Sequence, residues 1–303
     1  MNAGVHIDIK NVILALFTTI LIAGAIVFLS TREAWAGEFK FGFSTSLAEK
    51  YDDNIYLDEH DEEDDFITSL TPAVSVSYLT EATNLSLSYH PEFEFYAENS
   101  DENDTNHSGE FNLNSKLTPR LNLTVTDSLV FTPAEDTAGE ELRGHRRGSR
   151  SNDSDQLNNF FNTALSYQLF HATSVHAGFS HSLEDYEESE YQDSDEYSYE
   201  LGMDHRLTGS DTIFCSYRYR RMFYEDDKSL RSYRRRPGYG GENDTDVQSI
   251  SIGETHQFPR GLALTVSAGI ELIDEEHEDN ETEWSGNASL TKDFRTGSLG
   301  LSF

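Results

Sequence analysis

Apolar and polar residues alternate over long stretches of the chain, and the segment from Asn84 to Phe131 shows the pattern clearly. Apolar side chains occupy alternate positions in three runs: Leu85, Leu87, Tyr89, Phe93 and Phe95; Phe111, Leu113 and Leu117; and Leu121, Leu123, Val125, Leu129 and Phe131. Period two is the period of a β-strand, because successive side chains of a strand point to opposite faces of its sheet. The runs therefore predict strands with one apolar and one polar face.

The apolar faces of these strands need a common environment. Nearly every predicted strand has the same alternation, and none is apolar on both faces, so lipid fits better than a second apolar sheet. A sheet in lipid has to close on itself, because each unpaired backbone group costs several kcal/mol there. The sequence thus predicts an all-β fold, a transmembrane antiparallel up-and-down β-barrel.

Thirteen strand-like runs follow one another along the chain, and the last is short. They begin near Glu38, Phe66, Asn84, His107, Leu121, Gln156, Thr173, Tyr197, Asp211, Val247, Leu262, Glu283 and Ser298. Every second connection is tight, as at Thr118-Pro119-Arg120 and Thr208-Gly209-Ser210, and the others are long and polar, as from Pro133 to Asp155. In outer-membrane barrels the short turns face the periplasm and the long loops face outside. The pattern predicts that sidedness and about 12 to 14 visible strands in one domain.

Residues 1–36 have the composition of a signal peptide. Lys10 precedes an uninterrupted apolar run from Val12 to Leu29, and an Ala-x-Ala motif, Ala34-Trp35-Ala36, stands before Gly37. Such a small-residue motif is where a signal peptidase cleaves. A permanent membrane helix is the alternative, since the run is long enough to span. Export together with a barrel, residues 37–303, predicts the outer membrane of a Gram-negative bacterium, in contact with its lipid and lipopolysaccharide.

Composition and charge agree with a barrel. The mean hydropathy is -0.59, which is no objection because only alternate residues of a barrel strand have to be apolar. The formal net charge is -33, which argues against nucleic acid as a partner. The single cysteine, Cys215, falls on the same strand face as Ile213 and Tyr217, so we expect a small lipid-facing residue.

The sequence contains no recognisable motif of catalytic or metal-ligating residues. The acidic run from Asp58 to Asp65 lacks the glycine of an EF-hand loop and any defined ligand spacing, which favours a solvated loop. His90, His176, His181 and His205 are scattered without the cysteine or carboxylate partners of a metal site, and no haem-attachment motif occurs. We therefore expect no cofactor, no metal and no enzymatic activity.

Arginines are concentrated in the two longest loops of this acidic chain. The candidate constriction residues are Arg143, Arg146, Arg147 and Arg150 in one loop, Arg234, Arg235 and Arg236 in the other, and the lumen-facing Arg218 and Arg220 beside it. Rings of like charge set the selectivity of pores, so such a cluster could attract anionic solutes or sugar polymers. The alternatives are pairing with loop carboxylates and contact with lipopolysaccharide phosphates.

Five short motifs of the strands and their connections are distinctive. They are Tyr51-Asp52-Asp53-Asn54-Ile55-Tyr56-Leu57, Asp65-Phe66-Ile67, Pro91-Glu92-Phe93-Glu94-Phe95-Tyr96, Leu117-Thr118-Pro119-Arg120-Leu121 and Leu165-Ser166-Tyr167-Gln168-Leu169. Together they resemble the β-barrel porin 2 family. The resemblance covers essentially Glu38 to Phe303. It implies an outer-membrane barrel of the kind encoded beside exopolysaccharide export and PEP-CTERM sorting systems, with polysaccharide export machinery as a partner. It implies no substrate and no catalytic residues.

Three functions are open at this point. The first is a channel, linked to exopolysaccharide export or to the passage of polar or anionic solutes. The second is a non-conducting structural barrel, or a sleeve for a periplasmic partner or a cytochrome. The third is a barrel lipase, which the lack of a legible Ser-His-Asp/Asn set disfavours.

The strand count raises a question about the C-terminus. Thirteen strands would leave Phe303 away from the periplasm, whereas single-chain bacterial barrels have an even number of strands. We therefore expect one of two explanations. Either the sequence is truncated or frame-shifted, or the run from Glu38 is not a wall strand and twelve strands close without it.

Overall fold

The computed structural model describes residues 37–56, 62–133, 155–186, 193–225, 244–275, 280–294 and 297–303. The predicted signal peptide lies outside these residues. Thirteen strands and one 3-10 turn, η1 (Ser100–Glu102), make up the described chain. The strands are β1 (Glu38–Asp52), β2 (Asp65–Leu79), β3 (Thr83–Tyr96), β4 (Asp104–Thr118), β5 (Leu121–Thr132), β6 (Gln156–Phe170), β7 (Thr173–Tyr186), β8 (Asp193–Arg206), β9 (Asp211–Glu225), β10 (Thr245–Phe258), β11 (Leu262–Glu275), β12 (Glu281–Phe294) and β13 (Gly297–Ser302).

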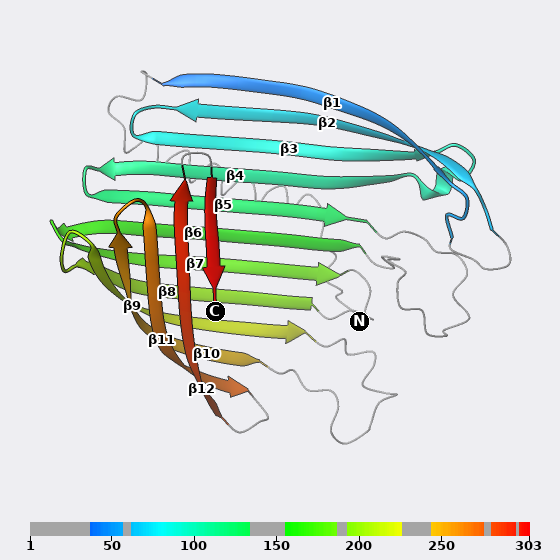
Figure 1. Cartoon of the computed structure of the whole chain (residues 1–303). Coiled ribbons are helices and arrows are strands. Elements are labelled where there is room, and N and C mark those ends of the chain that lie inside the picture. The colour runs from blue at the N-terminus through cyan, green and yellow to red at the C-terminus, as the bar shows by residue number, and fades with distance from the viewer. Residues whose placement is uncertain are drawn as a thin grey trace. The chain divides into compact units, whose positions relative to one another are not determined.

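The strands form one antiparallel sheet in chain order, from β1 to β13 (Figure 1). This confirms the predicted up-and-down arrangement, in which each strand pairs with the strand before and after it. The predicted starts agree within four residues, and the largest difference is at β8, which begins at Asp193 rather than Tyr197. The Asp193 carboxylate accepts the backbone N–H of Tyr186 at 2.8 Å, so polar residues extend this strand beyond its alternating part.

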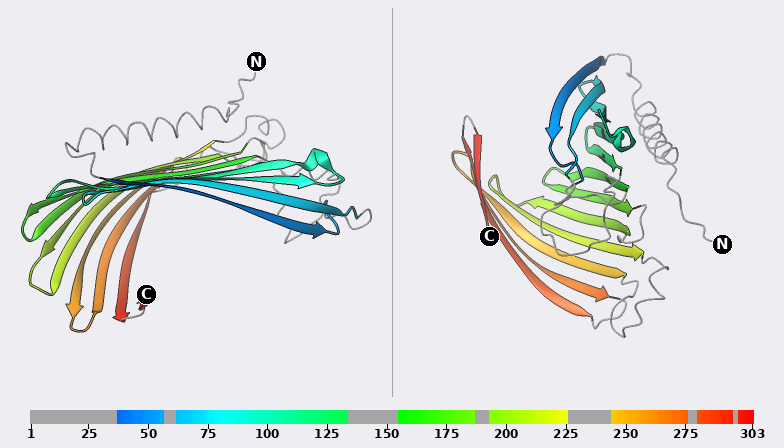
Figure 2. Two further views of the ribbon diagram at one scale, coloured as in Figure 1. Left: turned by 90° about the horizontal axis from the view of Figure 1, so that it is seen from above. Right: turned by 90° about the vertical axis from the view of Figure 1, so that its right-hand side faces the viewer.

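The run from Glu38 is a strand of the sheet. β1 pairs with β2 over its whole length, from Glu38 opposite Leu79 to Asp52 opposite Asp65. The alternative that excluded this run from the wall is therefore wrong. At the other end of the order, β13 pairs with Ser289–Phe294 of β12 (Figure 2). No helix in the described part of the chain is both long and apolar enough to cross a membrane.

The chain divides into two compact units. Unit 1 comprises Met1–Leu113, Thr126–Phe160 and Leu183–Asp193, and unit 2 comprises Asn114–Val125, Phe161–Ser182 and Ser194–Phe303.

In unit 1, the registers of β1, β2 and β3 place residues of one kind opposite each other. Phe41 faces Val76, which faces Leu87, and one position away Lys40 faces Ser77, which faces Ser86. Apolar side chains thus form rows on one face and polar side chains form rows on the other. We call these the apolar face and the polar face.

Unit 2 repeats this segregation in β9 to β12. Tyr217 faces Ile250, which faces Ile270 and then Trp284, in one apolar row. Cys215 lies opposite Ile252 on the same face, so its predicted placement with Ile213 and Tyr217 is confirmed. On the polar face, the Ser216 and Ser251 hydroxyls are 2.7 Å apart.

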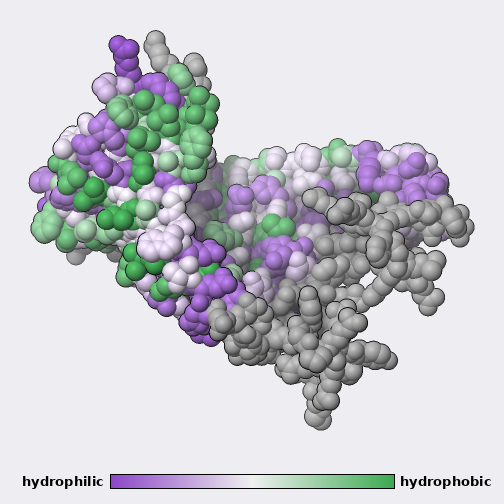
Figure 3. All heavy atoms as spheres, turned by 60° about the horizontal axis from the view of Figure 1, so that its bottom comes forward, coloured by the Kyte–Doolittle hydropathy of each residue, from purple (hydrophilic) through white to green (hydrophobic). Residues whose placement is uncertain are grey.

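Large apolar side chains on the apolar face are exposed. Phe41 is 79% exposed, Ile252 64% and Trp284 83%, which is far more than an aqueous surface normally tolerates in contiguous rows. The space-filling view shows such side chains in groups on the surface, next to hydrophilic ones (Figure 3). Lipid contact would remove these side chains from water.

Aromatic pairs lie near both ends of the strands. The rings of Phe39 and Tyr78, close to the β2–β3 turn, are 4.4 Å apart between centroids in unit 1. Those of Tyr197 and Phe223, toward the long connections, are 6.0 Å apart in unit 2. Amphipathic rings at these positions suit the two headgroup levels of a bilayer.

Candidate functional site

The polar face of unit 2 holds a group of charged side chains on three adjacent strands. His176 comes from β7, Glu200 and Asp204 from β8, and Arg218 from β9. We call these four residues the polar-face charge cluster. Glu200 and Asp204 lie on one face because they are four positions apart, an even number, in a strand. The Glu200–Arg218 contact places them on the face that carries Ser216.

Ion pairs connect the cluster. His176 Nε2 lies 3.5 Å from Glu200 Oε1, and its Nδ1 lies 3.4 Å from Asp204 Oδ2. Arg218 donates to Glu200 Oε2 through Nη2 at 2.6 Å and through Nε at 3.0 Å. Both carboxylates thus have cationic or potentially cationic partners, and the cluster fixes the relative positions of β7, β8 and β9.

Gly202 makes room for the imidazole. It stands between Glu200 and Asp204 on the same face of β8, and a Cβ at this position would be only 2.0 Å from His176 Nε2. A side chain at position 202 would therefore occupy the space of the ring. The absence of one lets His176 lie across β8 between the two carboxylates.

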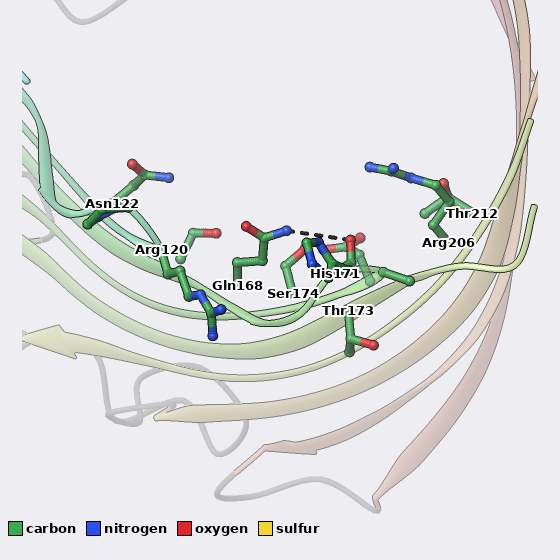
Figure 4. A pocket seen from close by; sticks show the side chains of 12 residues that line it. Arg120, Asn122, Gln168, His171, Thr173, Ser174, Arg206 and Thr212 are labelled. Carbon is green, nitrogen blue, oxygen red and sulfur yellow. Dashed lines mark hydrogen bonds between the residues drawn. The ribbon is translucent and has the colours of Figure 1, made fainter. Parts of the chain in front are cut away.

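Next to the cluster, toward the short turns, the polar face is hollowed. The hollow has a volume of ≈ 220 Å³ (Figure 4). It is lined by Pro119, Arg120, Asn122, Ser166, Gln168, His171, Ala172, Thr173, Ser174, Asp204, Arg206 and Thr212. These residues belong to β5 to β9 and to the β4–β5 and β6–β7 turns, so five neighbouring strands contribute to one concave surface.

Backbone hydrogen bonds hold the walls of the hollow. The N–H of Gln168 donates to the Arg120 carbonyl at 2.8 Å, and that of Arg206 donates to the Ala172 carbonyl at 2.7 Å. The Gln168 side chain also donates through Nε2 to the His171 carbonyl at 3.5 Å. The side chains of Asn122, Gln168 and Arg206 project to one side of the sheet, whereas the Arg120 guanidinium points away from them (Figure 4).

The predicted constriction arginines fall into two groups. Arg143, Arg146, Arg147, Arg150, Arg234, Arg235 and Arg236 lie outside the described residues, so their arrangement stays a prediction. Arg218 and Arg220 lie two residues apart on the polar face of β9, and their predicted position at a lumen constriction stays a prediction. Arg218 is engaged by Glu200, so part of its charge is neutralised there.

A third arginine of β9 lies on the opposite face. Arg221 reaches Asp244 with Nη2 at 3.3 Å and Asp246 with Nε at 3.7 Å, and its guanidinium carbon is 4.6 Å from the centroid of the Phe223 ring. On this face Tyr219 donates its hydroxyl to Asp246 at 2.7 Å. These groups lie toward the long connection after β9, where the apolar face becomes polar.

The Asp65 carboxylate of unit 1 accepts hydrogen bonds from the start of the β3–β4 connection. Asp65, only 2% exposed, heads β2, and its oxygens accept hydrogen bonds from the segment that follows β3. The donors are the N–H groups of Ala97 at 2.9 Å, Glu98 at 3.1 Å and Asn99 at 2.9 Å, and the Asn99 side chain at 3.1 Å. Four donors on one buried carboxylate fix the start of the β3–β4 connection against β2.

This environment favours the ionised carboxylate. Asp65 is the terminal residue of a 15-residue strand, outside the roughly 9 to 11 residues that a tilted strand needs to cross a bilayer. Burial raises the pKa of the Asp65 carboxyl, but the hydrogen bonds from Asn99, Glu98 and Phe66 outweigh burial and hold that pKa below its ordinary value.

Sequence reasoning did not identify the hollow or the role of Gly202. Glu200, Gly202 and Asp204 at alternating positions are a signal, since they place a gap between two carboxylates on one strand face. His176 could not be assigned to that gap without the register of β7 against β8. In the part of the chain that the structure describes, no group of three or more His, Cys, Asp or Glu side chains is placed to hold a metal ion.

No protein-family model and no curated protein sequence matches this chain. The resemblance to the β-barrel porin 2 family therefore stays a prediction. Among solved structures, the chain is similar to the siderophore receptor PirA from Pseudomonas aeruginosa, with a TM-score of 0.51 and 11% identity, over 88% of this chain and 44% of that one. The chain thus spans less than half the length of that receptor.

Two further structures are similar at lower scores. An outer membrane channel from Pseudomonas putida F1 has a TM-score of 0.43 and 11% identity, over 85% of this chain and 97% of that one. OmpT, an outer membrane protein of Vibrio cholerae, has a TM-score of 0.41 and 9% identity, over 90% and 98%. Of these three structures, the receptor has a TM-score above 0.5, so the structural argument rests on it. At 11% identity this likeness shows the fold alone, which is the antiparallel sheet of an outer-membrane β-barrel.

Proposed function

We propose that this chain forms the wall of an outer-membrane channel for polar or anionic solutes. The observation that carries the proposal is the segregation of the two faces. Apolar rows such as Phe41, Val76 and Leu87 alternate with polar rows such as Lys40, Ser77 and Ser86. A barrel wall in lipid requires an apolar outer side, and a conducting lumen requires a polar inner side.

The number of strands supports a lumen. An eight-stranded barrel has an interior that side chains can fill, and diameter grows with strand number. A barrel that includes the thirteen strands of this sheet is wider than that. The polar-face charge cluster and the hollow would then line the inside, near the predicted periplasmic end.

The physiological context is part of the proposal. Residues 1–36 would direct export and be removed before Gly37, and the mature barrel would contact outer-membrane lipid and lipopolysaccharide. The resemblance to the β-barrel porin 2 family favours a link to exopolysaccharide export, with the export machinery as a partner. The barrel would act without enzymatic chemistry and without a cofactor.

Two measurements test the proposal. The mature protein should fractionate with the outer membrane, have Gly37 as its N-terminal residue, and show β-rich circular dichroism in detergent. It should also conduct ions after reconstitution into planar bilayers. Recovery as a soluble periplasmic monomer would exclude the barrel, whereas a folded, inserted barrel that does not conduct would favour the structural barrel or sleeve instead.

A further inference from the structure

The hollow on the polar face contains an arginine with no ionic partner among the described residues. Arg206 donates its backbone N–H to Ala172, but no described carboxylate pairs with its guanidinium. Arg218 and Arg221, in contrast, are each engaged by carboxylates. Figure 4 shows that the Arg206 guanidinium points into the hollow.

From this arrangement we infer that the hollow binds a small hydroxylated carboxylate, such as a sugar acid, either free or as one unit of a polysaccharide. The inference deepens the proposed channel function, on which it rests for its physiological meaning. The binding chemistry depends only on unit 2.

Arg206 supplies the recognition of the carboxylate. The guanidinium is planar and always charged, and its N–H groups match the two oxygens of a carboxylate in a bidentate pair. Its place on the wall is fixed by the Arg206 N–H bond to Ala172, 2.7 Å long, so the side chain starts from a defined backbone position.

The other lining groups suit hydroxyls. Asn122 and Gln168 offer amide donors and acceptors, and Ser166 and Ser174 offer hydroxyl groups. Asp204 can accept a hydrogen bond from a ligand hydroxyl while its Oδ2 remains 3.4 Å from His176 Nδ1. Because Pro119 and Ala172 are the only aliphatic residues in the lining, a hydrocarbon ligand would find little apolar surface.

Charge favours a monoanion over a phosphate. The Arg120 guanidinium points away from Asn122, Gln168 and Arg206, which leaves one cation on their side of the hollow (Figure 4). Asp204 lies in the same lining, so a second negative charge on the unit inside the hollow would be repelled. One carboxylate with several hydroxyls satisfies both conditions.

Calorimetry on the purified, folded full chain in detergent tests the inference. The probes are galacturonate, trigalacturonate and, as the neutral counterpart, galactose. We expect both acids to bind and galactose to bind at least about tenfold more weakly, since a hydrogen-bonded ion pair is lost. Binding of all three probes with equal affinity, or of none, would overturn the inference.

Two variants localise the site. Arg206→Gln should weaken galacturonate binding at least about tenfold, and Arg206→Lys should recover only part of the loss because an ammonium lacks the bidentate geometry. Arg260→Gln, in the β10–β11 turn and outside the lining of the hollow, removes the same charge at the same end of the strands and should leave the affinity unchanged. Each variant has to show the β-rich circular dichroism of the parent. An Arg206→Gln protein that binds like the parent, or an Arg260→Gln protein that loses binding equally, contradicts the assignment.

Two further comparisons distinguish a free acid from a polymer unit as the ligand, and failure of the binding site from failure of the channel. Tighter binding of trigalacturonate than of galacturonate indicates a polymer unit, whereas equal affinity indicates that the free acid suffices. Both results support the site. A barrel that binds galacturonate through Arg206 but does not conduct refutes the channel and retains the site. A barrel that conducts but binds neither acid refutes the site and retains the channel.

Discussion

The imidazole of His176 occupies the space that a side chain at Gly202 would fill. A Cβ on Gly202 would lie 2.0 Å from Nε2 and 2.2 Å from Cε1 of His176. The ring therefore reaches Glu200 and Asp204 only because residue 202 has no side chain. The contact links a backbone position of β8 to a charged group of β7, and it makes the polar-face charge cluster sensitive to a single methyl group.

Gly202→Ala should destabilise the barrel by about 1 to 3 kcal/mol, the usual effect of forcing extra atoms into an occupied site. The ring has to move, and its ion pairs with Glu200 and Asp204 are then lost. Urea unfolding of the protein in lipid vesicles, followed by tryptophan fluorescence, measures the change.

Gly286→Ala is the matched control for this substitution. Gly286 is also a strand residue, but a Cβ there meets nothing within 4 Å, so we expect no loss of stability. The clash can be isolated with His176→Ala, since Gly202→Ala should cost much less in that background. Equal destabilisation with and without His176 would show that the methyl group acts on something else.

Asp65→Asn should loosen the segment that follows β3. An amide has one acceptor oxygen in place of two, so some of the donors from Ala97, Glu98 and Asn99 lose their partner. Each buried donor left unsatisfied costs roughly 1 to 3 kcal/mol. Hydrogen exchange of these three amides should accelerate in the variant, while amides in the middle of β11 keep their parental rates. Unchanged exchange at Ala97 to Asn99 would contradict the role of Asp65.

The same carboxylate predicts a pH dependence. The pKa of Asp65 is lower in the folded state than its ordinary value of about 3.9. Its contribution is therefore fully present above the unfolded pKa and is lost as the pH falls toward the folded pKa. Unfolding free energy measured between pH 7 and pH 3 should decline more for the parent than for Asp65→Asn. Parallel curves would refute the linkage.

The strands could be predicted because period two is a local property of the sequence. Leu87 and Cys215 are assigned to the apolar face from their neighbours alone, and the registers place both there. The ends were less certain, as at Asp193, where a side chain contact with the Tyr186 backbone rather than apolar alternation begins the strand. The register that places Cys215 opposite Ile252 depends on how β9 pairs with β10, and the alternation within each strand does not specify this pairing.

The hollow could not be predicted for the same reason. Its lining runs from Pro119 to Thr212, and the strands bring these residues together only through successive registers. Arg206 has no local feature that distinguishes it from Arg218, although one points into the hollow without a described ionic partner and the other is paired with Glu200. The arginines concentrated in the loops were conspicuous in the sequence because they are adjacent, which is a property of composition rather than of geometry.

The apolar face gives a prediction for the energetics of insertion. Leu87 lies opposite Val76 in an apolar row, and its neighbour Ser86 lies opposite Ser77 in a polar row. Leu87→Arg should destabilise the inserted barrel by about 2 to 4 kcal/mol if it faces the bilayer midplane, and Ser86→Arg by far less. Leu264→Arg should repeat the effect in unit 2. Unfolding in lipid vesicles compares the three variants, and similar losses for Leu87→Arg and Ser86→Arg would mean that the two faces do not differ in their exposure to lipid.

The last prediction concerns the selectivity of the channel. Arg143, Arg146, Arg147, Arg234, Arg235 and Arg236 stand in two long connections of a strongly acidic chain, and a cluster of positive charge at a constriction raises the local concentration of anions. Replacing all six with Ser should lower the anion preference, measured as the reversal potential across a planar bilayer under a salt gradient.

The alternative roles of these arginines predict a different result. If they pair with loop carboxylates or with lipopolysaccharide phosphates, the substitution leaves the reversal potential of the purified channel unchanged. Arg221→Ser is the control, because Arg221 is paired with Asp244 and Asp246 on the apolar side of β9 and should not influence the permeating ions. Raising the ionic strength should also reduce the parental anion preference, since screening shortens the reach of the loop charges. A preference that survives both the six substitutions and high salt would have to arise elsewhere on the polar face.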